Sequence, residues 1–190
     1  MDIQLKNICK KYGDNCVFNN ANFTFKEKMG TCILGPSGIG KTTILRIIMN
    51  LEKIDSGEVL GVNNKIISVV FQEDRLCENL SVLANLKLVN DNISNFEINK
   101  ALEKVGLNNC INKKVSELSG GMKRRISIVR ALIYEFDILL LDEPFKGLDE
   151  ENKIKTINYI NEKTKDKTVI MVSHNIDESK LICSNFLKVK

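Results

Sequence analysis

The sequence is poor in the residue types that small metal sites and disulfide frameworks require. Its 190 residues include one histidine, His174, no tryptophan, and six cysteines without a C-x-x-C pair. A structural zinc site needs four Cys or His ligands at close spacing, so we expect none here. A chain of this size without a secretory signal seldom carries a disulfide framework. We therefore expect reduced, mostly buried thiols.

Long apolar runs are also missing. No segment approaches the roughly 20 apolar residues that a membrane-spanning helix needs. The N-terminus, Met1-Asp2-Ile3-Gln4, has neither the basic nor the apolar region of a secretory signal. These absences predict a cytoplasmic protein whose contact with a membrane is peripheral.

The charge is modest and evenly spread. The net charge is +4, and lysines and asparagines occur throughout the chain rather than in clusters. This distribution favours an ordinary solvated surface over a nucleic-acid footprint, so we expect no nucleic-acid partner. The length fits one compact domain, residues 1–190.

The order of apolar patterns predicts an α/β fold. Short β-branched or alternating runs predict strands at residues 3–11, 16–25, 31–34, 66–71, 138–141, 168–172 and 186–189. Helical spacing predicts helices at residues 42–50, 82–89, 96–105, 120–133, 150–164 and 176–182. Alternating strands and helices imply a mainly parallel sheet covered on both faces.

Two segments depart from that alternation. The first two strands flank a Gly13-Asp14-Asn15 turn, which predicts an N-terminal antiparallel β subdomain. From about residue 73 to residue 133 the pattern is helical, which predicts an α-helical subdomain inserted between strands. Ser56-Gly57 is predicted to be a turn.

The strongest local motif lies between a predicted strand and a predicted helix. Residues 35–42 fit G-x-x-x-x-G-K-[ST], the pattern of a nucleoside triphosphate site. Its glycines let backbone N–H groups approach phosphates at the positive end of the following helix. Lys41 can neutralise the β- and γ-phosphates, and the Thr42 hydroxyl can bind Mg²⁺. The candidate nucleotide ligands are Gly35, Pro36, Ser37, Gly38, Gly40, Lys41, Thr42 and Thr43.

A second motif ends an apolar strand with two carboxylates, Asp142 and Glu143. Asp142 can order Mg²⁺ through water, and Glu143 can polarise an attacking water. The alternative interpretation is a core strand followed by surface carboxylates.

A third motif, Leu-Ser-Gly-Gly at residues 118–121, opens a basic helix. Ser119 and the N–H groups of Gly120 and Gly121 suit a γ-phosphate. We interpret the basic residues of this helix as a solvated or phosphate-facing side rather than a nucleic-acid site. They are Lys123, Arg124, Arg125 and Arg130.

In this order the three motifs resemble the ATP-binding cassette (ABC) ATPases, and the resemblance covers nearly the whole chain. It implies a P-loop NTPase core, with ATP and Mg²⁺ as ligands and Glu143 as the catalytic base. Met122 stands where the family most often has Gln, although methionine is frequent in some importer branches. Lys146 stands where the family more often has a small residue.

The resemblance also gives roles to four single residues. Gln72 matches the Q-loop glutamine, which contacts Mg²⁺ and the attacking water. His174 matches the switch histidine, which contacts the γ-phosphate, and Asp149 lies in a segment that resembles the D-loop. Tyr12 matches the aromatic residue that stacks on adenine, although it also fits a tyrosine that only ends a strand.

In the ABC family, two cassettes enclose two ATP molecules, and the signature of one subunit closes over the phosphate loop of the other. The resemblance therefore implies an ATP-hydrolysing subunit that powers solute transport, with import favoured over export. The implied partners are separate membrane permease subunits, a second ABC subunit in a homodimer or heterodimer, and a solute-binding protein. The implied location is the cytoplasmic, inner face of the cell membrane.

Residues 70–76, together with Met122, most resemble the nitrate/sulfonate/taurine-type importer ATPases. Two alternatives stay open: an exporter-type ATPase, and a soluble ABC ATPase acting on DNA or ribosomes. The second is disfavoured because the segment between Thr42 and Leu118 lacks sustained heptads and the chain holds one cassette. A non-hydrolysing binding module is expected to lose Glu143 or His174, and both are present.

Overall fold

The computed structural model describes residues 1–189, which form two sheets. The smaller sheet is antiparallel. β1 (Ile3–Tyr12) and β2 (Asn15–Phe25) make a hairpin, and β4 (Ser56–Leu60) pairs with the other edge of β1. The antiparallel β subdomain predicted at the N-terminus is confirmed.

The larger sheet is parallel and has the strand order β5-β6-β7-β3-β8. Its strands are β3 (Gly30–Leu34), β5 (Ile67–Val70), β6 (Ile138–Asp142), β7 (Thr168–Val172) and β8 (Asn185–Lys188). All five were predicted from their apolar runs. β6 and β7 are buried along their whole length, as expected of strands covered on both faces.

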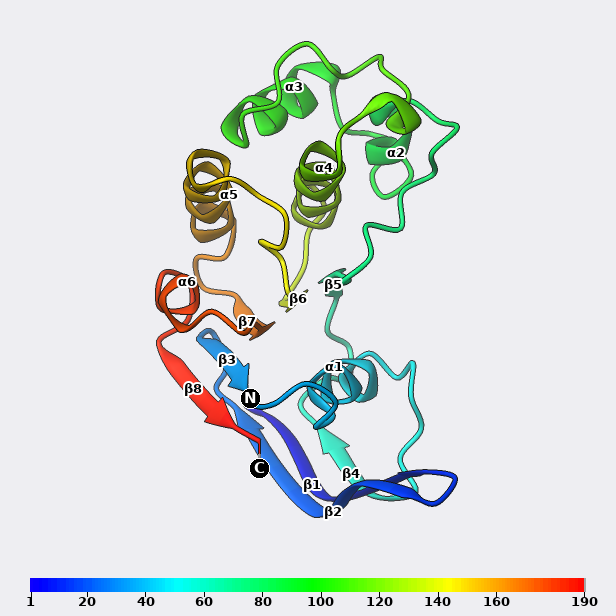
Figure 1. Ribbon diagram of the computed structural model, residues 1–190, viewed down its shortest axis with the longest axis vertical. Helices are drawn as coiled ribbons and strands as arrows, with labels where there is room; N and C mark the ends of the chain where they lie inside the picture. The colour runs from blue at the N-terminus through cyan, green and yellow to red at the C-terminus, as the bar shows by residue number, and fades with distance from the viewer. Residues whose placement is uncertain (190) are drawn as a thin grey trace.

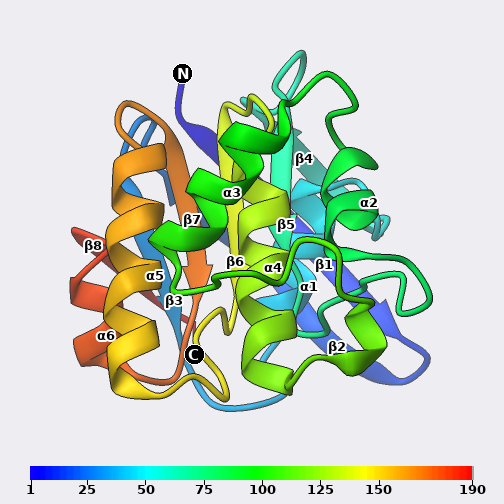
Figure 2. The same ribbon diagram turned by 90° about the horizontal axis from the view of Figure 1, so that it is seen from above.

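Helices cover both faces of the parallel sheet. Figure 1 shows α1 on the side of the antiparallel sheet, and α2, α3, α4 and α5 on the opposite side. Figure 2, from above, shows α4 and α5 running side by side with α3 across them. No helix within residues 1–189 is long and apolar enough to cross a membrane. The helices are α1 (Lys41–Ile48), α2 (Val82–Lys87), α3 (Asn95–Lys104), α4 (Gly120–Leu132), α5 (Glu150–Lys163) and α6 (Ile176–Lys180), with a 3-10 turn η1 (Val115–Glu117).

Alternation along β6 divides the interior into two apolar cores. Leu139 and Leu141 point into the core made with the helices of the insertion and α5. Ile138 and Leu140 point into the core shared with α1 and the antiparallel sheet. Successive side chains of a strand face opposite ways, so one strand contributes to both cores.

Capping residues set where the inserted helices begin. The Ser94 hydroxyl accepts from the Glu97 N–H, and the Glu97 carboxylate accepts from the Ser94 N–H, which makes a capping box for α3. Ser81 caps α2 by accepting from the Ala84 N–H. The insertion lies between β5 and β6 as predicted. Its residues 73–81 are irregular, however, which corrects the expectation of helix from about residue 73.

The predicted turn at Ser56-Gly57 is wrong, because these residues begin β4. Gly57 adopts φ of +104°, and a Cβ there would lie 2.5 Å from the carbonyl oxygen of Lys6 in β1. Only glycine permits this close approach. The same glycine that signals a turn in the sequence therefore allows a strand to pair.

The cysteines are less buried than expected. All six are free thiols, and Cys32, Cys110 and Cys183 are buried. Cys16 and Cys77 are exposed, which corrects the expectation of mostly buried thiols for these two.

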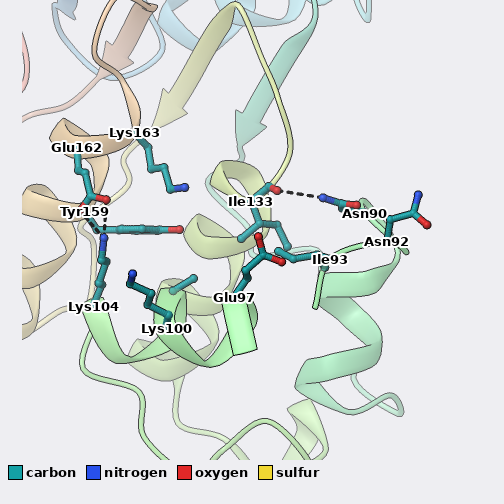
Figure 3. Close-up of a pocket in the computed structure, with 11 residues that line it drawn as sticks. Asn90, Asn92, Ile93, Glu97, Lys100, Lys104, Ile133, Tyr159, Glu162 and Lys163 are labelled. Carbon is teal, nitrogen blue, oxygen red and sulfur yellow. Dashed lines mark hydrogen bonds and ion pairs between the residues drawn. The ribbon is translucent and has the colours of Figure 1, made fainter. Parts of the chain in front are cut away.

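A buried hydroxyl of α5 has no hydrogen-bond partner among the described residues. Tyr159 is 2% exposed, and its ring lies 5.9 Å and 5.8 Å from the Nζ atoms of Lys104 and Lys163. Figure 3 shows the hydroxyl pointing into a groove lined by residues of α3 and α5. Burial raises the pKa of Tyr159 above its ordinary value. A buried hydroxyl without a partner lowers the free energy of unfolding by about 1–3 kcal/mol.

Tyr159→Phe is expected to raise the free energy of unfolding by roughly 1 kcal/mol, because it removes the unpaired hydroxyl and keeps the ring. Urea unfolding measures the change. Tyr134→Phe is the matched control, since it removes the same atom from a side chain that is 49% exposed. The control should stay within about 0.5 kcal/mol of the wild type. A clear loss of stability in Tyr159→Phe would mean that the hydroxyl has a partner in solution.

Candidate active site

The predicted phosphate loop connects β3 to α1. Gly40 adopts φ of +101°, and a Cβ there would lie 2.6 Å from side-chain atoms of Val17 and Phe18 in β2. A side chain at this position would therefore clash with β2. The loop follows a buried strand, and its tip at Pro36, Ser37 and Gly38 is exposed.

Lys41 and Thr42 begin α1 and point in different directions. Lys41 is buried, and its Nζ donates to the carbonyl oxygens of Gly35 and Pro36, each at 2.8 Å. The Thr42 hydroxyl donates to the Asp142 carboxylate at 3.0 Å. Thr43, the next residue of α1, is half-buried. The two halves of the predicted nucleotide site, loop and strand end, are thus in direct contact.

The end of β6 holds the two predicted carboxylates in different surroundings. Asp142 is 5% exposed, and burial raises its pKa, while the Thr42 hydrogen bond acts in the opposite direction. Glu143 has a left-handed backbone with φ of +46°, and its N–H donates to the Val172 carbonyl at 2.9 Å. The left-handed residue turns the chain out of the sheet directly after Asp142.

His174 and Gln72 lie on either side of these carboxylates. The His174 Nε2 is 3.2 Å from a carboxylate oxygen of Glu143. Gln72 follows β5 and lines a cavity of about 380 Å³ together with Thr42 and Asp142. One edge of the sheet therefore carries six polar groups: two carboxylates, a lysine, a hydroxyl, an amide and an imidazole. This set is able to bind phosphate and a divalent cation and to take a proton from water.

The Leu-Ser-Gly-Gly motif lies elsewhere. Gly120 and Gly121 begin α4, which packs on the face of the sheet opposite α1 (Figure 1). Ser119 is the N-cap residue of α4, and its hydroxyl accepts from the Met122 N–H. A Cβ at Gly121 would lie 3.3 Å from the Gly147 carbonyl oxygen, so the motif packs against the loop before α5.

Two further predicted residues have local contacts. Asp149 caps α5 by accepting from the N–H and the side-chain amide of Asn152, and these hydrogen bonds lower its pKa. Tyr12 ends β1, is 44% exposed, and has the Lys10 Nζ 4.6 Å from its ring centre. The nucleotide roles of both residues stay predictions.

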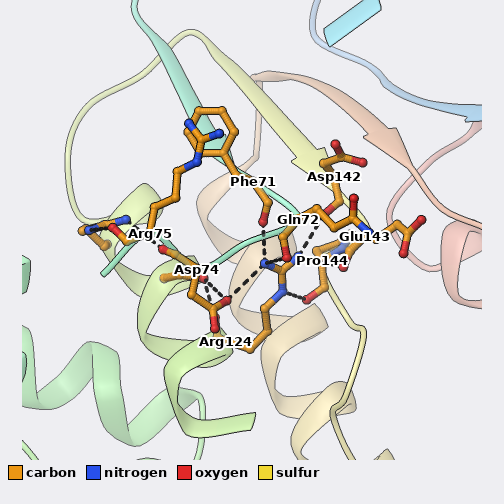
Figure 4. A network of polar contacts seen from close by, with 10 residues as sticks. Phe71, Gln72, Asp74, Arg75, Arg124, Asp142, Glu143 and Pro144 are labelled. Carbon is orange, nitrogen blue, oxygen red and sulfur yellow. Dashed lines mark hydrogen bonds and ion pairs between the residues drawn. The ribbon is translucent and has the colours of Figure 1, made fainter. Parts of the chain in front are cut away.

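The basic residues of α4 correct an expectation. Arg124 and Arg125 are buried, with 4% and 7% exposure, and Arg130 donates to the carbonyl oxygens of Asp74 and Arg75. These three arginines do not form a solvated or phosphate-facing side, and the fourth basic residue, Lys123, is half-buried and pairs with Glu78. α4 is buried on most of its circumference, and apolar residues at 126, 128, 129 and 132 are the sequence signal for this. Figure 4 shows Arg124 reaching the backbone beside Gln72 and Glu143.

The chain is similar to many known proteins. The profile of the ABC transporter family matches residues 18–146. The spermidine/putrescine import ATP-binding protein PotA of Mycoplasma mycoides is 36% identical over 194 residues, covering 93% of this chain and 55% of that protein. The phosphonates import ATP-binding protein PhnC of Fusobacterium nucleatum is 32% identical and covers 99% of this chain and 88% of its own.

A solved structure agrees with these relatives. A putative ABC transporter ATP-binding protein from Pyrococcus furiosus superposes with a TM-score of 0.85 at 27% identity, covering 100% of this chain and 98% of its own. The chain spans about half the length of the PotA relatives that it matches. The profile match and these relatives show that the chain belongs to the ABC transporter family and carries its ATP-binding domain.

Proposed function

We propose that the chain is the ATP-hydrolysing subunit of a transporter that imports a solute through separate membrane subunits. The observation that carries this proposal is the contact of Glu143 with His174 beside the Thr42–Asp142 pair. A protein that only bound nucleotide would not need a carboxylate and an imidazole there. Residues 1–190 act as one nucleotide-binding domain, with the helical subdomain of residues 73–133 inserted in its core.

The oxygen donors beside the phosphate loop fit Mg²⁺. Thr42 and Asp142 offer a hydroxyl and a carboxylate 3.0 Å apart, and Gln72 lines the same cavity. Mg²⁺ in phosphate sites uses one or two protein carboxylates and completes its ligands with water and phosphate. When bound, the metal would neutralise charge on the β- and γ-phosphates.

The chain's own groups would bind ATP and move the proton. Lys41 exchanges its two carbonyl partners for phosphate oxygens, and the N–H groups of residues 35–43 surround the phosphates. Glu143 accepts a proton from the water that attacks the γ-phosphorus, and ADP leaves as the bond to the γ-phosphate breaks. His174 orients the carboxylate of Glu143. Tyr12 stacks on the adenine.

Two copies of the chain would complete each site. The signature residues Ser119, Gly120 and Gly121 lie on the face of the sheet opposite α1, so they are poorly disposed to reach the phosphate loop of their own chain. A second copy related by a two-fold axis brings a signature over each loop, and Asp149 then lies at the interface between copies. We therefore propose a homodimer.

The relatives favour import. The names of PotA and PhnC describe import ATP-binding proteins, and proteins of that kind work with membrane permease subunits. We propose the same partners here, with a solute-binding protein, at the cytoplasmic face of the membrane. The two names describe different solutes, spermidine or putrescine for PotA and phosphonates for PhnC. The nitrate/sulfonate/taurine type stays a prediction.

Glu143→Gln is expected to reduce ATP turnover by roughly 10²-fold or more, because the attacking water loses its base while the phosphate site keeps its shape. Nucleotide binding should be retained, since the change leaves Lys41 and Thr42 intact. Steady-state phosphate release and equilibrium binding of a fluorescent ATP analogue measure the two quantities. Lys41→Ala is the contrasting variant and should mainly weaken binding. Wild-type turnover in Glu143→Gln would refute the role of Glu143.

Asp142→Asn is expected to abolish most Mg²⁺-dependent turnover without lowering the stability of the nucleotide-free protein. Burial raises the pKa of Asp142, so its ionised form is disfavoured in the folded state and lowers stability at neutral pH. The variant should therefore be at least as stable as the wild type at pH 7. This advantage should shrink as the pH falls toward the unfolded carboxyl pKa of about 4. Asp91→Asn, at an exposed position, is the control. Urea unfolding at several pH values measures the trend, and a large loss of stability at pH 7 would contradict it.

Mixing Lys41→Ala chains with Ser119→Arg chains tests the two-copy site. In a mixed dimer, one loop and one opposing signature remain intact, so the mixture should recover up to about a quarter of wild-type activity while neither variant alone is active. Phosphate release after subunit exchange measures the recovery. No recovery in demonstrably mixed dimers would exclude a site shared between copies.

A further inference from the structure

Arg124 occupies an unusual position for a charged side chain. It lies in α4, five positions after Ser119, and is 4% exposed. Its guanidinium lies between the segments that follow β5 and β6, as Figure 4 shows. These are the segments that carry Gln72 and Glu143.

All five guanidinium donors have acceptors. The Nε donates to the Pro144 carbonyl at 2.8 Å, and Nη2 donates to the Asp142 and Glu143 carbonyls at 2.9 Å and 2.7 Å. Nη1 donates to the Phe71 carbonyl at 2.5 Å and to the Asp74 carboxylate at 3.2 Å, with the Gln72 carbonyl at 3.4 Å. Neither lysine nor glutamine has enough donors in the right directions to span both segments.

These contacts fix the backbone on both sides of Glu143. Its left-handed φ of +46° is a conformation that residues with a side chain rarely adopt, so surrounding contacts must hold it. One nitrogen of Arg124 binds the carbonyl before Glu143 and the carbonyl of Glu143 itself. Another binds the carbonyl of the peptide bond that leads into Gln72. A single guanidinium therefore bridges the two backbone segments that carry the predicted catalytic side chains, beyond the pairing of β5 with β6.

The same guanidinium belongs to the signature helix. α4 is continuous from Gly120 to Leu132, so a shift of its first turn also shifts Arg124. We propose that Arg124 is a positioning residue, which sets the backbone of Glu143 and Gln72 and makes their placement depend on where the signature helix lies. This inference rests on the proposed function of ATP hydrolysis.

The test compares Arg124→Gln and Arg124→Lys with Arg130→Gln in the full chain. Arg130 is the matched control, because it is an arginine of the same helix that binds the carbonyls of Asp74 and Arg75 but none of residues 142–144. Arg124→Gln should lower kcat at saturating Mg-ATP by roughly 10-fold to 10²-fold, the scale of a small misplacement, with nucleotide affinity within about 3-fold of the wild type. Arg124→Lys, which keeps the charge, should show an intermediate kcat. Arg130→Gln should keep kcat within about 2-fold.

A double variant separates positioning from a general loss of structure. If Arg124 acts through Glu143, adding Arg124→Gln to Glu143→Gln should lower kcat little further, whereas independent effects would multiply. Urea unfolding checks that each variant is folded. If Arg124→Gln does not fold, Arg124→Lys alone and combined with Glu143→Gln provides the same comparison.

The outcomes distinguish this inference from the function on which it rests. Wild-type kcat in both Arg124 variants would overturn the positioning role, and multiplicative losses in the double variant would overturn the positioning of Glu143. Neither result would affect the assignment of ATP hydrolysis. Wild-type kcat in Glu143→Gln would overturn the proposed function itself.

Discussion

The parallel pairing of β3, β5, β6 and β7 is the constraint on which the site depends. Parallel strands all run in one direction, so the segments that follow them emerge at one edge of the sheet. The phosphate loop follows β3, Gln72 follows β5, Asp142 and Glu143 end β6, and His174 follows β7. Thr42 and Asp142, 100 positions apart, are hydrogen-bonded for this reason.

The same sheet explains the electrostatics of the site. β6 and β7 are buried on both faces, so the groups at their ends lie at the border between the core and the solvent. Asp142 is on the buried side of this border, and its pKa is raised by burial. Apolar packing that stabilises β6 therefore also removes the Asp142 carboxylate from water. Burial of this kind is frequent where a fold gives up some stability to keep a functional group in place.

Most of the fold was predictable because its signals are local. The signals for β6 and β7 are apolar runs, and the signal for the phosphate loop is a motif of eight residues. Each lies within a few neighbouring positions. β4 was missed because its partner, β1, is some fifty residues earlier, and because Gly57 looks the same in a turn and in a close strand pair.

Arg124 was missed for a related reason. An arginine in a basic helix is usually solvated, and its acceptors here are backbone carbonyls of two other segments, which no sequence pattern records. The positions of Thr42, Asp142, Glu143 and His174 followed from the order of strands. The resemblance already implied that the signature acts on the phosphate loop of another subunit, and the structure places the two motifs of one chain on opposite faces of the sheet.

The alternation of β6 has a consequence for how the molecule comes apart. Ile138 and Leu140 belong to one core, and Leu139 and Leu141 belong to the other, so β6 contributes side chains to both cores. If either core were to unfold alone, β6 would be exposed to solvent on one face. We therefore expect the core beside the phosphate loop and the core beside the signature helix to unfold together, as one cooperative unit.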